Sequence, residues 1–171
     1  MSKCYKCGKS IGFLKFTCRN CGRTFCSNCM TKVDVPSDLE PLFGLTDELC
    51  EPEFSLTKFS HVYCSDCAIK FNNCKNKLRS AIFLKNDVEL VSINYKGHKR
   101  YDKSSMHKIE SNFNKDKNES ERELRIMAKY FNRDMVINVE IMKEKRESET
   151  DSGGTYIYTV WKYTGYAVKR M

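Results

Sequence analysis

FTCRNCGRTFCSNC, residues 16–29, is the stretch that decides the fold of the first half of the chain. It holds two Cys-x2-Cys pairs with four residues between them. At this spacing two thiolates leave one tight turn and can bind the same tetrahedral ion. A further pair stands on each side, Cys4-x2-Cys7 before the stretch and Cys64-x2-Cys67 after it. Four pairs predict two metal sites, and all-thiolate ligation makes structural Zn²⁺ the expected ion, two per chain.

The spacing also bears on which pairs share an ion. A sequential scheme joins the first pair to the second, whereas a cross-braced scheme joins the first to the third. The second and third pairs are too close to act as halves of independent fingers, so the cross-brace is favoured, and it closes the long loop before the fourth pair. The expected ligands of the first zinc are Cys4, Cys7, Cys26 and Cys29, and those of the second are Cys18, Cys21, Cys64 and Cys67.

Composition divides the chain and limits its partners. All ten cysteines lie within residues 1–75, so we expect a double zinc finger there and a second domain over residues 76–171. The formal charge of +8 falls to about +4 when eight thiolates hold two Zn²⁺. A charge this modest does not by itself argue for nucleic acid, which is not the expected partner. No apolar run reaches the roughly 18 residues of a membrane span. The first residues lack an apolar signal core, which predicts a reducing, cytoplasmic location in which metal binding is favoured over disulfides.

The residues around the pairs resemble a known family. Cys4-x2-Cys7-Gly8-Lys9, the stretch at 16–29 and Val62-Tyr63-Cys64-x2-Cys67 are similar to FYVE-type zinc fingers over about residues 1–72. The resemblance implies a cross-braced treble-clef fold and a role in binding membranes or proteins. Members that bind phosphatidylinositol 3-phosphate carry two histidines before the third cysteine and an Arg two residues before the seventh. Here Lys15-Phe16-Thr17 and Val62 stand at those places.

The same resemblance indicates a contact site between the first and second pairs. Phe13 and Leu14 stand at the place of the family's membrane-inserting turret, and Lys15 and Arg19 are the cations beside them. An apolar tip flanked by cations could enter a bilayer or a partner's groove while the cations meet phosphate or carboxylate. The alternative is that Phe13 and Leu14 pack under the zinc turns or against the second domain.

The second half predicts a small α+β domain with the order β-β-α-β-β. We expect strands over residues 88–95, near 101, over 135–141 and over 155–168, with a charged loop tip at 143–151 and a solvated connection through most of 99–117. A helix should begin at a capping box formed by Ser120 and Glu123 and end at Asn132. The expected core contains Leu124, Met127, Phe131, Ile137, Val139 and Trp161. Parts of this half weakly resemble small YbjQ-type domains, over residues 128–139 and 163–168.

Nothing in the sequence predicts catalysis. The three histidines, His61, His98 and His107, stand in separate contexts, and eight cysteines saturate two tetrahedral ions. We therefore expect a non-enzymatic zinc-finger adaptor that binds a protein partner or an anionic membrane surface through its finger. If the ligand is a membrane surface, the protein would be a peripheral membrane protein. The alternatives are a protein that targets membranes by binding phosphatidylinositol 3-phosphate, and a RING-like component of a ubiquitin ligase. Cys50 and Cys74 are expected to be thiols without a role, and short helical turns are expected around Leu42, Phe43 and Leu45.

Overall fold

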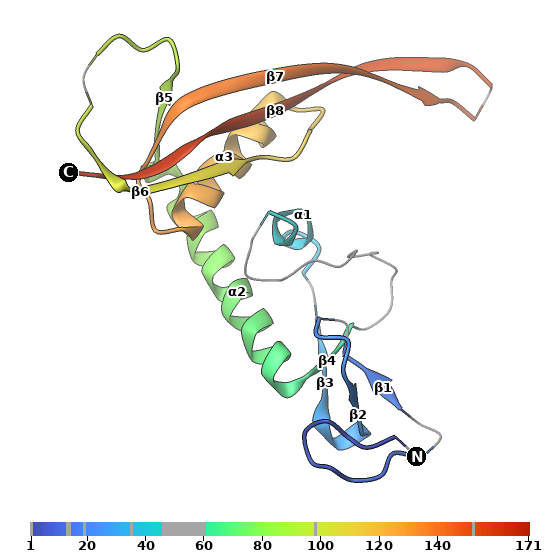
Figure 1. Cartoon of the computed structure of the whole chain (residues 1–171). Helices are drawn as coiled ribbons and strands as arrows, with labels where there is room; N and C mark the ends of the chain where they lie inside the picture. Colours follow the sequence, from blue (N-terminus) through green and yellow to red (C-terminus); the bar gives the residue numbers. More distant parts are fainter. Residues whose placement is uncertain are drawn as a thin grey trace. The chain divides into compact units, whose positions relative to one another are not determined.

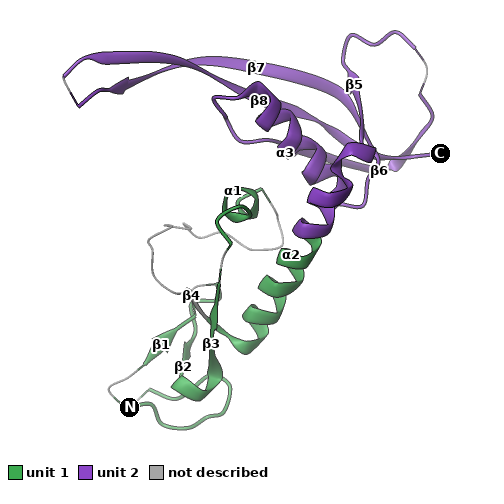
Figure 2. Ribbon diagram, turned by 180° about the vertical axis from the view of Figure 1, so that it is seen from behind, with its two compact units in different colours: residues 1–77 green, residues 78–171 purple. Residues whose placement is uncertain are grey.

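The computed structural model describes residues 2–12, 15–18, 20–34, 36–45, 61–97, 99–151 and 153–171. The chain forms two compact units, residues 1–77 and 78–171 (Figure 2). The sequence placed this division after residue 75. The boundary falls inside one continuous helix, α2 (Ser65–Leu84), rather than in a linker.

The first unit is built from two short pairs of antiparallel strands, one short helix and the beginning of α2. Strand β1 (Phe16–Thr17) pairs with β2 (Thr24–Phe25), and β3 (Met30–Val33) pairs with β4 (His61–Cys64). A 3-10 turn, η1 (Ser27–Cys29), joins β2 to β3, and the short helix α1 (Glu40–Phe43) follows β3. Helix α1 falls where the sequence predicted helical turns. Residues 46–60, which include Cys50, lie outside the described residues.

Helix α2 is the largest element that the sequence analysis missed. One face of it is almost completely buried: Ala68, Phe71, Cys74, Leu78 and Ala81. These residues recur every three or four positions, which is the period of a helix with one apolar face. Within the first unit, the Phe71 ring stacks on Phe43 of α1 with centroids 4.8 Å apart and lies 5.6 Å from the Tyr63 ring. Cys74 is therefore a core residue of this helix.

The second unit is a small α+β domain with a mixed four-stranded sheet (Figure 1). Its strands are β5 (Glu89–Ser92), β6 (Tyr101–Glu110), β7 (Met135–Glu149) and β8 (Thr155–Arg170), arranged β5-β7-β8-β6. Only the β5–β7 pair is parallel. Helix α3 (Lys117–Tyr130) packs against the sheet, and a 3-10 turn, η2 (Lys85–Asp87), connects α2 to β5.

Four of the six expected core residues are buried and two are not. Leu124, Met127, Ile137 and Val139 are at most 8% exposed. Phe131 and Trp161 are half-buried. Phe131 is the residue that ends α3, and its ring lies 4.1 Å from that of His107. The Trp161 ring is flanked by the ammonium groups of Lys117 and Lys143, so it occupies the rim of the core.

The predicted start of the α3 helix was wrong by one turn. The N-cap is Asp116, whose carboxylate accepts a hydrogen bond from the Asn118 N–H at 2.8 Å. Ser120 and Glu123 do not cap the helix, because both are buried and bond to other segments. The Ser120 hydroxyl donates to the Trp161 carbonyl at 2.7 Å, and the Glu123 carboxylate accepts from the Asn112 N–H at 2.7 Å.

The predicted loop tip at 143–151 and the solvated connection at 99–117 were also wrong. Strand β7 continues to Glu149, and its residues 143–149 pair with residues 155–161 of β8. Of the described residues, only Thr150, Asp151, Gly153 and Gly154 separate the two strands, with Gly153 at φ 80°. Residues 101–110 form β6, and the strand expected over 88–95 is limited to Glu89–Ser92. Exposed charged residues can form these strands because backbone hydrogen bonds to the neighbouring strand, and not burial of side chains, stabilise them.

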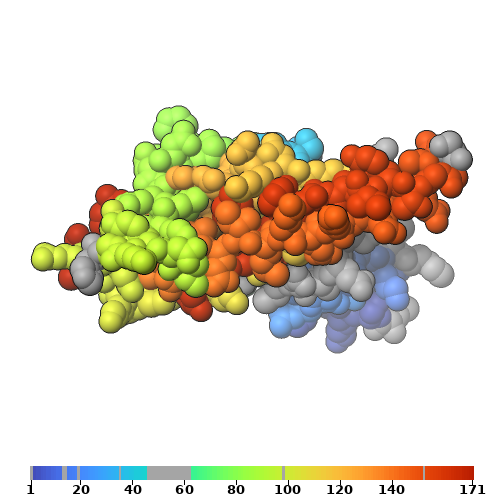
Figure 3. All heavy atoms as spheres, turned by 90° about the horizontal axis from the view of Figure 1, so that it is seen from above, coloured from blue at the N-terminus to red at the C-terminus, as the bar shows by residue number. Residues whose placement is uncertain are grey.

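The outer parts of β7 and β8 form a two-stranded ribbon that runs beyond the rest of the second unit. In Figure 3 the ribbon, coloured orange to red, continues past the atoms of α3. Isolated two-stranded hairpins are marginal in water. Along this one, Arg146 and Lys162 flank the Phe113 ring, and Lys115 lies 4.1 Å from the centre of the Tyr158 ring. These cation–aromatic contacts add to backbone pairing in stabilising the ribbon.

Candidate metal centre

Eight cysteines come together in two groups of four. One group is Cys4, Cys7, Cys26 and Cys29, and the other is Cys18, Cys21, Cys64 and Cys67. In each group the sulfur atoms all lie within 4.8 Å of one another. These are the cross-braced sets that the spacing favoured, not the sequential ones.

The first site joins a turn at the N-terminus to the end of the first hairpin. Cys4 and Cys7 lie in a tight turn that Gly8 completes at φ 69°, where its N–H donates to the Cys4 carbonyl at 2.9 Å. A side chain at that φ is strained, so glycine suits the position. The Tyr5 N–H donates to the Thr24 carbonyl at 3.0 Å, which ties this turn to β2. Cys26 directly follows β2, and Cys29 is the last residue of η1.

The second site joins a similar turn to the start of α2. Cys18 and Cys21 lie in the turn between β1 and β2, and Gly22 completes it at φ 66° with its N–H on the Cys18 carbonyl at 2.9 Å. Cys64 is the last residue of β4, and Cys67 lies in the first turn of α2. Helix α2 therefore begins at the metal site. Three of the four ligands, all but Cys21, are buried.

Two polar side chains support the sites, and the sequence analysis named neither. The Asn20 amide donates to the Cys67 sulfur at 3.4 Å, a contact of the kind that orients a metal ligand. Lys6 donates to the Ser65 hydroxyl and forms an ion pair with Asp66 at 3.4 Å. The first turn thus also contacts the start of α2. A signal was present, because Lys6 and Asn20 each stand directly before the second cysteine of a pair.

The cysteines of each site have opposed pKa shifts. In the first site, backbone N–H donors, that of Cys7 foremost, lower the pKa of Cys4 to about 6. A hydrogen bond between the thiols of Cys29 and Cys26 raises the pKa of Cys29 to about 12. In the second site, burial opposes ionisation of Cys18, yet N–H donors of Cys64 and Cys21 bring its pKa down to about 7. Burial raises that of Cys67 to about 12. Such crowded thiols can all ionise only around a cation.

The donor set and spacing fit a tetrahedral metal ion. Metal–sulfur bonds of about 2.3 Å place tetrahedral sulfurs about 3.8 Å apart. The Cys7 and Cys26 sulfurs are 3.8 Å apart. Four cysteines fill the coordination shell of such an ion, so neither site keeps a position for water or substrate.

The structure describes only part of the expected contact site. Lys15 is exposed, directly before β1. Phe13, Leu14 and Arg19 lie outside the described residues. Ile11, in the same segment, is buried, and its N–H donates to the Ser2 carbonyl at 2.8 Å.

No family model matches the chain, and no curated protein or solved structure is significantly similar to it. Among the described residues, no helix combines the length and apolar character needed to cross a bilayer. The two cysteine sites are therefore the observations from which a function can be argued.

Proposed function

We propose that residues 1–77 form a structural zinc module with one Zn²⁺ in each group of four cysteines, and that the protein is a non-catalytic adaptor. The observation that supports this most directly is the pair of interleaved, closed four-cysteine sites. A catalytic zinc site keeps one coordination position open, whereas four thiolates leave none. The zinc ions would cross-link segments that are far apart in the sequence, and their role would be to stabilise the fold.

The zinc module needs such cross-links because its hydrogen-bonded structure before α2 is slight. Strands β1 and β2 have two residues each, and α1 has four. In small metal-dependent domains the free energy of zinc binding is folding free energy. In this proposal, zinc binding fixes the two cysteine turns and thereby the surface between them, where a partner is bound.

The proposed binding surface is the segment between the first and second cysteine pairs, and its proposed ligand is an anionic membrane surface. Exposed Lys15 provides charge, and the resemblance to FYVE-type fingers suggests that Phe13 and Leu14 provide an apolar tip. Because the histidine pair of phosphoinositide-binding members is replaced by Phe16-Thr17, we expect attraction to anionic lipids in general, weakened as salt rises. A protein partner bound by the same segment is the competing possibility.

Vesicle sedimentation tests this surface. Zinc-loaded protein should sediment with vesicles that contain phosphatidylserine, and much less with pure phosphatidylcholine. The double substitution Phe13→Ser with Leu14→Ser should weaken this binding while zinc content and melting temperature stay unchanged. Ile69→Ser is the matched control, because Ile69 is an exposed apolar residue elsewhere in the zinc module.

Three results would count against the proposal. Melting of the double variant at much lower temperature would show that Phe13 and Leu14 belong to the core. Unchanged binding by a stable double variant would place the contact elsewhere. Binding only to vesicles with phosphatidylinositol 3-phosphate would favour the specific lipid-binding alternative.

A further inference from the structure

A small hollow in the second unit carries an excess of positive charge. It lies between η2 and α3 and has a volume of about 210 Å³. Its lining is three cations, two amides and one carboxylate: Lys85, Arg122, Arg125, Asn86, Asn118 and Glu121. Pockets for drug-sized ligands start at about 300 Å³, so this hollow suits a smaller group. None of its residues takes part in the metal sites.

Arg125 lines one side of the hollow and is held in place by three hydrogen bonds. Its Nε and Nη2 donate to the same Glu121 oxygen at 3.0 and 2.8 Å, and its Nη1 donates to the Val88 carbonyl. The negative charge of Glu121 is therefore balanced by Arg125. Two of the five N–H groups of a guanidinium are left after three such bonds. Arg122 is likewise paired with Glu119, just outside the lining, so the net excess of charge is the one positive charge of Lys85.

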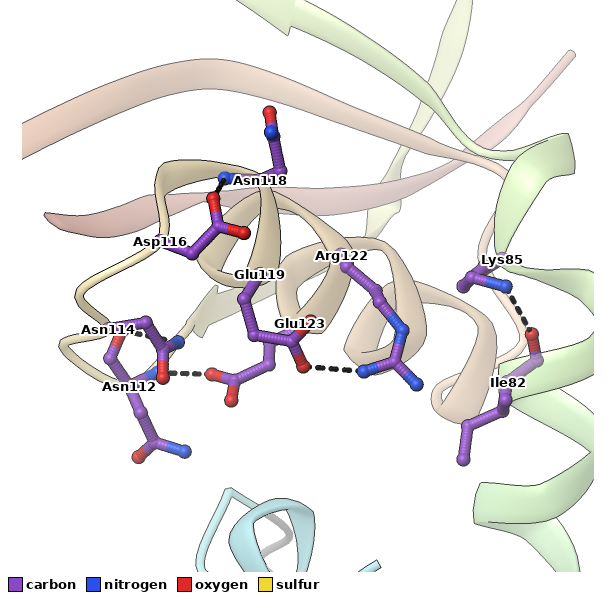
Figure 4. Close-up of polar contacts among 9 residues, drawn as sticks. All are labelled: Ile82, Lys85, Asn112, Asn114, Asp116, Asn118, Glu119, Arg122 and Glu123. Atoms are coloured by element: carbon purple, nitrogen blue, oxygen red, sulfur yellow. Dashed lines mark hydrogen bonds and ion pairs between the residues drawn. The ribbon is translucent and has the colours of Figure 1, made fainter. Parts of the chain in front are cut away.

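Lys85 and Arg122 are held more loosely. Lys85 donates to the Ile82 carbonyl at 3.2 Å, and Arg122 pairs with Glu119 one turn away on α3. The Arg122 and Glu119 side chains are 37% and 42% exposed. Ion pairs this exposed contribute about 0–1 kcal/mol. A multivalent anion can compete for both cations, and Figure 4 shows Arg122 leaving α3 on the side of Lys85.

We propose that this hollow binds a phosphate group, either inorganic phosphate or a phosphate monoester. Phosphate has several acceptor oxygens and up to two negative charges, which match a planar guanidinium and an ammonium group. Asn118, the second residue of α3, also lines the hollow, and its side-chain amide can donate to a phosphate oxygen. A phosphate monoester can be free in solution or be the headgroup of a lipid, and the two sources are separated below.

The test uses the full-length, zinc-loaded chain and inorganic phosphate. Amide signals of Asn86, Asn118 and Arg122 should shift and saturate as phosphate is added, while chloride at the same ionic strength leaves them in place. Shifts that grow without saturation, or that chloride reproduces, would show a general ionic atmosphere and overturn the proposal.

Variants assign the binding to this hollow. Lys85→Gln and Arg122→Gln should each weaken phosphate binding about tenfold, the equivalent of one charge-assisted hydrogen bond. Lys145→Gln, which removes an exposed cation from β7, should bind like the unaltered protein. Equal affinity in all three variants would overturn the assignment.

Two further arms identify the source of the phosphate. Saturable binding of glycerol 3-phosphate would indicate a soluble ester. Binding to vesicles with phosphatidic acid, lost in Arg122→Gln but kept in the Phe13→Ser, Leu14→Ser variant, would indicate a lipid headgroup. Vesicle binding lost only in the Phe13→Ser, Leu14→Ser variant, without binding of either soluble phosphate, would overturn the phosphate site and leave the zinc-module surface intact.

Discussion

Glu123 is a buried carboxyl group, although the sequence predicts it as part of a capping box at the start of a helix. It is 2% exposed and bonds to the Asn112 N–H beyond the helix (Figure 4). Burial raises the pKa of this carboxyl above its ordinary value, although the hydrogen bonds from Asn112 and Asn114 partly oppose the shift. The folded protein therefore binds a proton more tightly here than the unfolded chain does.

This shift predicts a pH-dependent stability. The folded-state pKa is the higher one, so the stabilising contribution of Glu123 is complete below the unfolded pKa and is lost as pH rises through the folded pKa. Glu123→Gln keeps an oxygen for the Asn112 N–H and removes the titration. As pH rises from about 4.5, the ordinary pKa of a glutamate, to about 7.5, urea unfolding of the second unit should show the unaltered protein losing stability relative to this variant. A constant difference across that range would contradict the raised pKa.

Gly165 is required by packing and not by its backbone angles. A Cβ at this position of β8 would lie 2.7 Å from a methyl carbon of Val136 and 3.1 Å from the Ile137 carbonyl. Gly165→Ala should lower the free energy of unfolding of the second unit by about 1–3 kcal/mol, the usual cost of overpacking. Urea denaturation measures this. Gly154→Ala is the control, because its Cβ would meet only the Thr150 hydroxyl, at 3.1 Å, and should change stability little.

At the level of elements, local signals were reliable where no distant contact competed. The Cys-x2-Cys pairs and Gly8 and Gly22 could be read directly, because a metal-binding turn is a local structure. The start of α3 could not be predicted in this way. Ser120 and Glu123 fit a capping box, but the fold uses them to bond Trp161 and Asn112, and Asp116 takes over the cap.

The ribbon and α2 were missed for different reasons. Residues 143–149 are mostly charged and carry no burial signal, so their strand structure depends on pairing with residues 155–161, which no local pattern reveals. Helix α2 did have a pattern, the buried face from Ala68 to Ala81. Because Cys64 and Cys67 enclose the first residues of α2, this pair taken alone predicts a metal-binding turn there and not the start of a helix. The contact residues Phe13, Leu14 and Arg19 remain predictions.

At the scale of the whole molecule, the two metal sites depend on each other. Their ligands alternate along the chain, so the hairpin of β1 and β2 lies between ligands of both. Cys26→Ser should therefore reduce the zinc content from two ions per chain to one or none and unfold the zinc module, because lost zinc binding is lost folding energy. Elemental analysis measures the zinc.

The second unit should survive that change. It contains no cysteine, and its core of Leu124, Met127, Ile137 and Val139 lies entirely within residues 78–171. Methyl signals of these core residues in nuclear magnetic resonance spectra of Cys26→Ser should stay dispersed. Cys50→Ser, which leaves the eight proposed ligands intact, should retain two zinc ions and is the control. Collapse of the core signals in Cys26→Ser would show that the two units fold as one.

The turn between β7 and β8 offers a practical opening for the experiments above. Residues 150–154 close a ribbon whose outer part is exposed on both strands. Exposed turns of this kind tolerate inserted sequence well. A short peptide tag or a dye attachment site placed after Gly153 should leave the core of the second unit undisturbed, which would let vesicle and phosphate binding be followed by fluorescence.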